Sequence, residues 1–351
     1  MFDLTQARLT TLAIHKVGNK VRNEGVIASK ELFELNEEMQ LTLQDYFLTP
    51  FKAEEFFKFT HDSDLSLNPM NRYIKELFTQ SKEKWLELSY PILQHLYEIS
   101  VHPHIKGGEL YVAHFRECEV DGQPLEAIGI FKSEYKELYL KFEEEEEQLK
   151  MHPEQGVPVK RLDKGCLIFK TYEDDGFSLM MVDKDTEDTH YWMDDFLQVS
   201  RIQDNSYQTS TFLNVTKDFC DEILASDQDR KDQLVFLNRS MNYFSKNDEL
   251  DVEEFKQSTL ELPQHKEAFD HYLQNIEEQT GFAPASEGFP ISKYAVRQMK
   301  KEFKSIIKLD NKIEIKLNPR NTAESAEFME RGYDEQRGMY FYKIYFNEEE
   351  D

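Results

Sequence analysis

Apolar and polar positions repeat with different periods along this chain, and the changes of period separate its elements. Residues 9–17 form an apolar run that predicts a first strand. Apolar side chains recur at helical spacing over 39–47 and 73–97, which predicts two helices, the second kinked or broken at Pro91. Because both helices precede the main block of strands, we expect them to cover one face of its sheet.

From residue 109 the period becomes that of a strand, and two Asp-Gly turns stand between apolar runs. Asp-Gly in this setting is the strongest short signal for a β-hairpin, so the region predicts an antiparallel sheet. One of the apolar runs leads into Glu143–Glu147, a block of five like charges that we interpret as a solvated strand end or loop. The apolar runs are 110–115, 125–131, 138–142, 167–172 and 177–182.

Beyond a polar linker at 204–206, three amphipathic stripes predict helices, and an alternating segment at 312–317 predicts a strand. The aromatic alternation of 339–346 suits a second strand that pairs with it. We therefore expect an α+β protein. Its N-terminal domain, 1–203, would hold an antiparallel or mixed sheet with covering helices. A mainly helical domain, 204–351, would end in a β-hairpin.

The segment from Phe289 to Arg320 has a charge opposite in sign to that of the rest of the chain. Between Lys293 and Arg320, nine basic residues stand against three acidic ones, whereas the formal net charge of the chain is −26. If 292–307 is one helix capped by Ser292, five of the basic side chains fall within about 100° of arc beside an apolar stripe.

The strand at 312–317 would add two lysines on the face opposite its apolar residues, Ile313, Ile315 and Leu317. A basic helix followed by such a strand forms an anion-binding surface of the size that a duplex backbone requires. An ordinary solvated helix face produces the same pattern and remains the alternative. The candidate DNA-binding residues are Lys293, Arg297, Lys300, Lys301, Lys304, Lys312, Lys316 and Arg320.

A smaller basic island surrounds the turn after the first strand. Lys16, Lys20, Arg22 and Lys30 outnumber Glu24 there. Such a composition is typical of an ordinary solvated turn, which is the interpretation we favour.

Composition limits the class of protein. The 351 residues include 13% aromatic and 31% charged side chains, and the mean hydropathy of −0.68 predicts a soluble protein with room for two domains. No apolar run approaches the roughly 20 residues of a membrane span, and the N-terminus lacks the pattern of a signal peptide. Cys118, Cys166 and Cys220 are widely spaced and odd in number, which indicates buried free thiols in a reducing cytoplasm.

Well-marked catalytic motifs are missing from the sequence: it has no GxSxG, P-loop, dinucleotide fingerprint or HExxH. Asp310 with Glu314 and Lys316 superficially resembles the metal site of some nucleases, but strand alternation explains the same residues. His95, His102 and His104 lack a nearby acid or cysteine at ligand spacing. We therefore expect a non-enzyme with no cofactor, metal or small-molecule substrate.

Several segments in order resemble the bacterial nucleoid-associated protein family of the NdpA or YejK type. They begin with Leu12–Lys20 and Leu48–Phe51, continue through Gly107–Phe115 and Tyr207–Leu224, and end with Phe289-Pro290 and Val296–Lys301. The resemblance implies an acidic, cytoplasmic protein of the nucleoid that binds double-stranded DNA. It supplies no contact residues, so those named above rest on charge alone.

The sequence therefore favours a largely sequence-independent DNA-binding protein and leaves one competing interpretation. An acidic interaction module, or a DNA mimic, would recruit a basic partner through its negative surface and use the basic helix in a subunit contact. A homo-oligomer is compatible with either interpretation, and neither requires a membrane.

Overall fold

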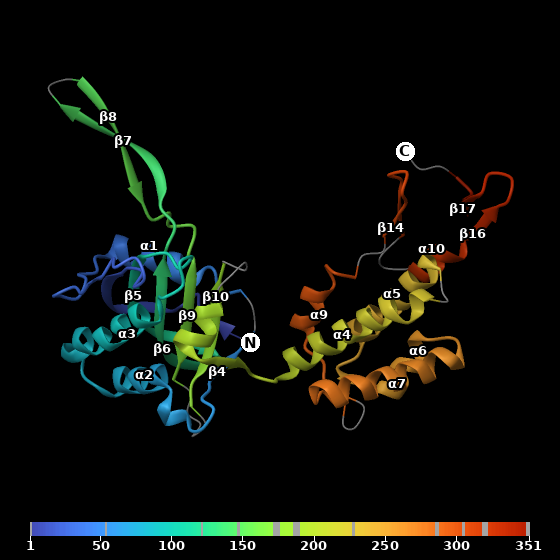
Figure 1. Cartoon of the computed structure of the whole chain (residues 1–351), viewed down its shortest axis with the longest axis horizontal. Helices are drawn as coiled ribbons and strands as arrows, with labels where there is room; N and C mark the ends of the chain where they lie inside the picture. Colours follow the sequence, from blue (N-terminus) through green and yellow to red (C-terminus); the bar gives the residue numbers. More distant parts are fainter. Residues whose placement is uncertain are drawn as a thin grey trace. The chain divides into compact units, whose positions relative to one another are not determined.

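The computed structural model describes residues 2–52, 55–120, 122–145, 148–170, 176–184, 190–226, 229–284, 288–303, 306–317 and 322–348. The chain is α+β, as expected from the sequence, and it divides into two compact units, Met1–Ile202 and Gln203–Asp351 (Figure 1).

The first unit is built on an antiparallel sheet of nine strands among the described residues. Their order is β11-β4-β10-β9-β6-β5-β2-β3, and the short β1 pairs with the end of β5. The hairpins β5–β6 and β9–β10 confirm the two pairings predicted from Asp-Gly. The strands are β1 (Phe2–Asp3), β2 (Arg8–Val17), β3 (Val26–Ile27), β4 (Phe57–Phe59), β5 (Gly108–Val120), β6 (Gln123–Ser133), β9 (Lys164–Phe169), β10 (Ser178–Asp183) and β11 (Val199–Arg201).

Both faces of this sheet are covered by helices, which corrects the expectation that the helices lie on one face. Successive residues of β5 alternate between two separate cores, with Val112 in one and Ala113 in the other. Helices α2 (Pro69–Thr79) and α3 (Trp85–Ile99) pack on the first face, and α1 (Glu37–Leu48) packs on the second. Because the strands are apolar on both sides, neither face can be left in water.

We predicted a kink or a break at Pro91; helix α3 contains this residue without ending there, so the helix is not broken at it. The interruption comes earlier, where Gln80 adopts an extended backbone after α2. The Trp85 side chain is 4% exposed, and its indole N–H donates to the carbonyl of Leu77 at 3.2 Å. This hydrogen bond joins α3 to α2. Short helices complete the unit: η1 (Leu65–Leu67), η2 (Lys82–Lys84), η3 (His190–Trp192) and η4 (Met193–Leu197).

A two-stranded ribbon, β7 (Glu137–Glu145) with β8 (Gln148–Gly156), extends away from the sheet of the first unit (Figure 1). We call this ribbon the arm. The strand β7 continues through Glu143 and Glu144, as expected for a solvated strand end. Glu146 and Glu147 lie outside the described residues.

The second unit is mainly helical around a phenylalanine-rich core. Phe212 lies between Phe244, Phe255 and Phe269, with ring centroids 5.2–6.1 Å apart, and all four are fully buried. Its elements are α4 (Asn205–Glu222), η5 (Leu224–Ser226), α5 (Arg230–Lys246), β12 (Glu249–Leu250), α6 (Val252–Thr259), α7 (Pro263–Thr280), β13 (Phe289–Pro290), α9 (Lys293–Met299), β14 (Ile306–Lys308), β15 (Glu314–Lys316), α10 (Thr322–Glu327), β16 (Met329–Asp334) and β17 (Met339–Ile344).

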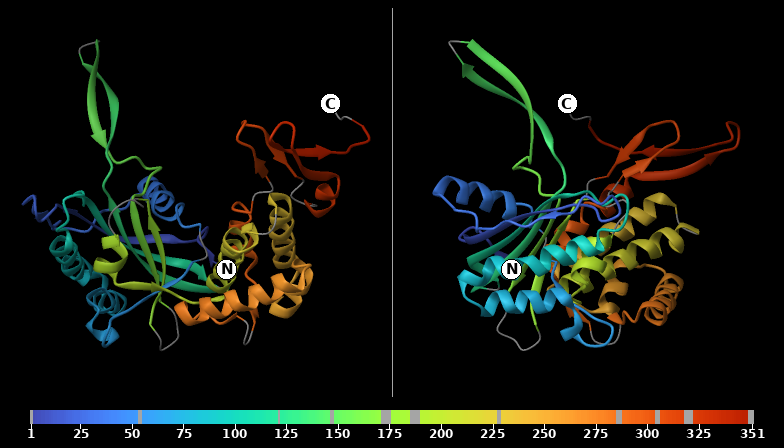
Figure 2. Two further views of the ribbon diagram at one scale, coloured as in Figure 1. Left: turned by 45° about the vertical axis from the view of Figure 1, so that its right-hand side comes forward. Right: turned by 60° about the vertical axis from the view of Figure 1, so that its left-hand side comes forward.

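Two hairpins close the chain, which confirms a terminal hairpin but corrects its partners. β14 pairs with β15, and β16 pairs with β17, so Met339–Ile344 does not pair with the 312–317 segment. Each strand takes its nearest neighbour in sequence across a short turn, which costs less loop-closure entropy than the longer connection. Figure 2 shows both hairpins, in red, projecting from the helices of the second unit.

Candidate nucleic-acid interface

The basic segment begins with a short helix rather than the long one predicted. The Ser292 hydroxyl accepts from the amide of Ala295, which confirms the N-cap, but α9 ends at Met299. Ile306 and Ile307 belong to β14, so the predicted continuation of the helix to residue 307 is wrong. These β-branched residues are stable in a strand, and Ile307 is buried against α5.

Helix α5 contacts described parts of the segment at both of its ends. At its C-terminal end, the Lys293 ammonium contacts the carbonyl oxygens of Phe244, Ser245 and Asn247. At its N-terminal end, Leu234 packs with Ile307 of the hairpin β14–β15. The basic segment therefore runs along α5, whose 17 residues span about 25 Å.

Lys293 acts as a helix-terminus cation in this arrangement. Besides the three carbonyls, its Nζ lies 3.1 Å from Oδ1 of Asp248. A cation at the C-terminal end of a helix is stabilised by the helix dipole and by the unpaired carbonyls. The Lys293 charge is already engaged within the protein, which distinguishes it from the other predicted contacts.

Three side chains of the first half point to solvent: Arg297, Lys300 and Lys301 are exposed. Within the described part of the chain, none of them has a carboxylate partner; the neighbouring Glu302 instead binds Lys217 at 2.9 Å. Their charges are therefore available to an external anion.

The hairpin β14–β15 carries the second half. Lys308 lies 3.6 Å from Glu314 across the hairpin, so this carboxylate, whose resemblance to a nuclease metal ligand we considered superficial, pairs with a lysine. Lys312 occupies the turn at φ 68° and is exposed, while Lys316 lies on the exposed face opposite Ile315. Ile313, expected on the packed face, is 55% exposed because the strand begins only after it.

Five exposed cations of α9, the residues after it and the hairpin β14–β15 have no described acidic partner, and we call them the cationic strip. Lys304 and Arg320, two further predicted contacts, lie outside the described residues. Helix α5 itself is about 25 Å long, roughly two-thirds of the 34–36 Å turn of B-DNA. The members of the cationic strip are Arg297, Lys300, Lys301, Lys312 and Lys316.

The smaller basic island is used for folding. Lys20 pairs with Glu98, and Arg22 binds Glu24 at 2.7 Å while donating to the carbonyls of Pro103 and Ile105. Two of its four cations are thus paired within the first unit, while Lys16 and Lys30 are exposed, which is compatible with the solvated turn that we favoured.

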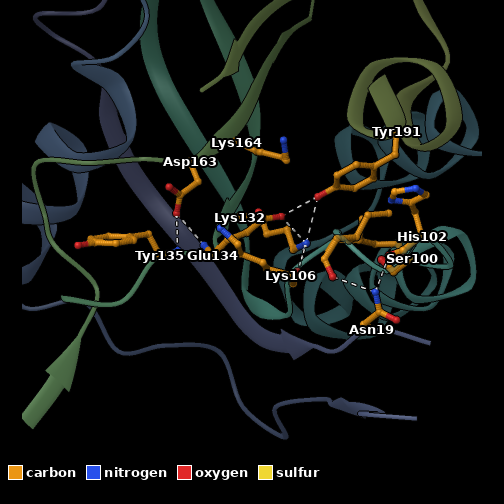
Figure 3. Close-up of polar contacts among 12 residues, drawn as sticks. Asn19, Ser100, His102, Lys106, Lys132, Glu134, Tyr135, Asp163, Lys164 and Tyr191 are labelled. Carbon is orange, nitrogen blue, oxygen red and sulfur yellow. Dashed lines mark hydrogen bonds and ion pairs between the residues drawn. The ribbon is translucent and has the colours of Figure 1, made fainter. Parts of the chain in front are cut away.

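A buried ionic cluster, which we did not predict, lies at the C-terminal end of β6 (Figure 3). The Lys132 ammonium donates to Glu134 Oε1 at 2.7 Å, to the Lys106 carbonyl at 2.7 Å and to the Tyr191 hydroxyl at 3.0 Å. Tyr191 in turn donates to the same Glu134 oxygen at 2.8 Å. Lys132 stands directly after the apolar run 125–131, where its burial has no distinguishing signal in the sequence.

Burial lowers the pKa of Lys132, and the adjacent Glu134 carboxylate opposes that shift. The ammonium has three acceptors, so it has no open position for a substrate. The neighbouring Asp163 accepts from the amides of Glu134 and Tyr135 at 2.7 and 2.9 Å, where the chain leaves β6 for the arm. The cluster therefore fixes the base of the arm.

The three cysteines are free and buried, as predicted, and burial raises the pKa of Cys118 and of Cys220 to about 12. Across the described residues, no group of three or more His, Cys, Asp or Glu side chains is arranged to hold a metal ion. Among the described helices, none combines the length and apolar character that a membrane span requires.

A family model described as nucleoid-associated protein YejK matches residues 13–338 of the chain. A comparison with curated proteins gives no significant match.

Proposed function

The chain belongs to the family of nucleoid-associated protein YejK, as its sequence motifs indicated, and from this membership and the cationic strip we propose that it binds double-stranded DNA without catalysing a reaction. Binding is largely independent of base sequence, because flexible lysine and arginine side chains at a surface contact phosphates rather than base edges.

The observation that carries the proposal is the cationic strip itself. Its members are exposed and lack acidic partners among the described residues, in a chain whose net charge is −26. Exposed charges more than about 8 Å away are largely screened at physiological salt, so the acidic remainder does not cancel a local contact with phosphates. Neutralising phosphates releases counterions, which drives binding.

An acidic protein-interaction module is the second candidate function. The excess of acidic side chains favours it, because a negative surface attracts a basic partner by long-range steering. In that case the cationic strip would contact protein carboxylates instead of phosphates.

A gel-shift titration with a plain 30-base-pair duplex at low salt, with and without Mg²⁺, separates these functions. We expect a shifted complex that weakens as salt rises, with the duplex intact in Mg²⁺. Absence of any shift at low salt would favour the interaction module, and Mg²⁺-dependent loss of the duplex would identify a nuclease.

A further inference from the structure

The arm is amphipathic, with one face apolar and the other charged. Directly opposed residues of an antiparallel pair share a face, and β7 and β8 pair Leu140 with Pro153 and Phe142 with Met151. The intervening pair, Lys141 with His152, lies on the other face. The apolar face comprises Leu138, Leu140, Phe142, Leu149, Met151 and Pro153.

No described part of the first unit covers this apolar face. Five of its side chains, Leu138, Leu140, Phe142, Leu149 and Met151, are between 55% and 76% exposed. Together they form an apolar patch of a few hundred Å², comparable with the largest patch on a typical monomeric protein, and patches of that size are often functional. A two-stranded ribbon alone is only marginally stable in water, so a partner that covers the apolar face would stabilise the arm.

The charged face needs no partner. The Tyr139 hydroxyl donates to Glu154 at 2.7 Å, and Lys141 pairs with Glu143 at 2.7 Å and with Glu154 at 3.5 Å. These groups satisfy one another in solvent, which leaves the apolar face as the side of the arm that gains from contact.

The charge of the arm selects the kind of partner. Residues 137–156 contain seven acidic residues against two lysines, which repels both DNA and an anionic membrane surface. The acidic residues gather toward the tip, where Glu144 shares the apolar face with Leu149.

The base of the arm has the opposite character. A groove of about 650 Å³ beside the base is lined by Lys52, Lys160 and Lys184, with the apolar Val159 and Met181. Asp45 and Asp183 also line the groove, but Asp183 binds the buried Lys164 at 2.7 Å. Lysines therefore outnumber the aspartates in the groove at the base, while glutamates gather at the tip, about 30 Å away along nine residues of strand.

We infer that the arm pairs with the arm of a second copy of this chain, antiparallel and apolar face to apolar face, so that each glutamate tip meets the other's lysine-lined base. A two-fold interface requires a surface complementary to itself, and an apolar stripe between opposite charges meets that requirement. The apolar face together with the charged residues around it would bury a surface that approaches the roughly 800 Å² per partner of a standard interface. The Asp163 anchor fixes the base of the arm and so reduces the entropy lost on pairing.

Sedimentation of the full chain tests this inference with a matched pair of variants. Phe142→Ser with Met151→Ser removes one cross-strand pair from the apolar face, whereas Lys141→Ser with His152→Ser removes the adjacent pair from the charged face. We expect a wild-type dimer, an increase of at least about 100-fold in the dissociation constant for the first variant, and little change for the second. A monomeric wild type, or equal effects of both variants, would overturn the inference.

A charge exchange tests the antiparallel orientation, independently of folding of the arm. Glu144→Lys or Lys160→Glu alone should weaken the dimer about 10-fold, and the two together in one chain should restore it to within about 3-fold. Additive weakening in the double variant would overturn the tip-to-base arrangement. Because DNA is not involved, these outcomes are independent of whether the chain binds DNA.

Discussion

Reversing two charges of the cationic strip, Lys300→Glu with Lys301→Glu, should weaken DNA binding strongly while leaving the fold intact. Both side chains are exposed and make no ion pair with a described residue, so the core around α9 loses no contact. If all five strip cations neutralise phosphates, log affinity falls against log salt with a slope of about −4 to −5, at −0.9 per phosphate.

The variant removes two of these contacts, so the slope should fall to about −2 to −3. At about 0.1 M salt each lost contact costs roughly 8-fold in affinity, and the two together about 60-fold before repulsion by the new carboxylates is added. Fluorescence anisotropy of a labelled duplex over a salt series measures both quantities.

The matched control is Lys75→Glu with Lys84→Glu, which changes the net charge by the same amount at exposed positions of the first unit. The control should bind within about 3-fold of the wild type, because Lys75 and Lys84 are not members of the cationic strip and exposed charges are screened by salt. Equal weakening by both variants would refute the assignment of a local strip and show that total charge governs binding.

Three further predictions concern stability and the roles of individual residues. Lys293→Met should lower the free energy of unfolding in urea by about 1 kcal/mol, because it removes the cation at the end of α5. It should change DNA affinity less than about 3-fold. A 60-fold loss of DNA affinity would instead place Lys293 in the interface. Lys132→Met should cost about 3 kcal/mol, because it strands the buried Glu134, and a cost below 1 kcal/mol would contradict the role of the ionic cluster. Burial lowers the pKa of His15 to about 4, so the unfolded chain binds a proton first as pH falls from 6.5 to 4. This difference should contribute about 2–3 kcal/mol to the fall in unfolding free energy over that range, and His15→Gln should remove that contribution in pH-resolved denaturation.

Local patterns predicted those parts of the fold that depend on neighbours in sequence. The Asp-Gly turns gave the hairpins of the sheet, and the Ser292 cap gave the start of α9. The end of α9 was not predictable in this way, because Ile306 and Ile307 are held by a strand partner and by Leu234 of α5, far away in the sequence.

The candidate site was likewise predictable from the sequence only in part. Charge counting found the basic segment, but it could not separate Lys293, whose partners are carbonyls at the end of α5, from Lys300, which faces solvent. The burial of Lys132 was invisible for the same reason, since its acceptors come from three separate segments. The apolar side of the arm could be seen only once the register of β7 and β8 was known.

The most direct measurement is acetylation footprinting of the lysines with and without duplex DNA at low salt. We predict that Lys300, Lys301 and Lys316 become protected by the duplex, while Lys75 and Lys160 react equally in both samples. Protection of Lys75 and Lys160 instead, or no protection at any lysine under conditions where the protein folds normally, would contradict binding through the cationic strip.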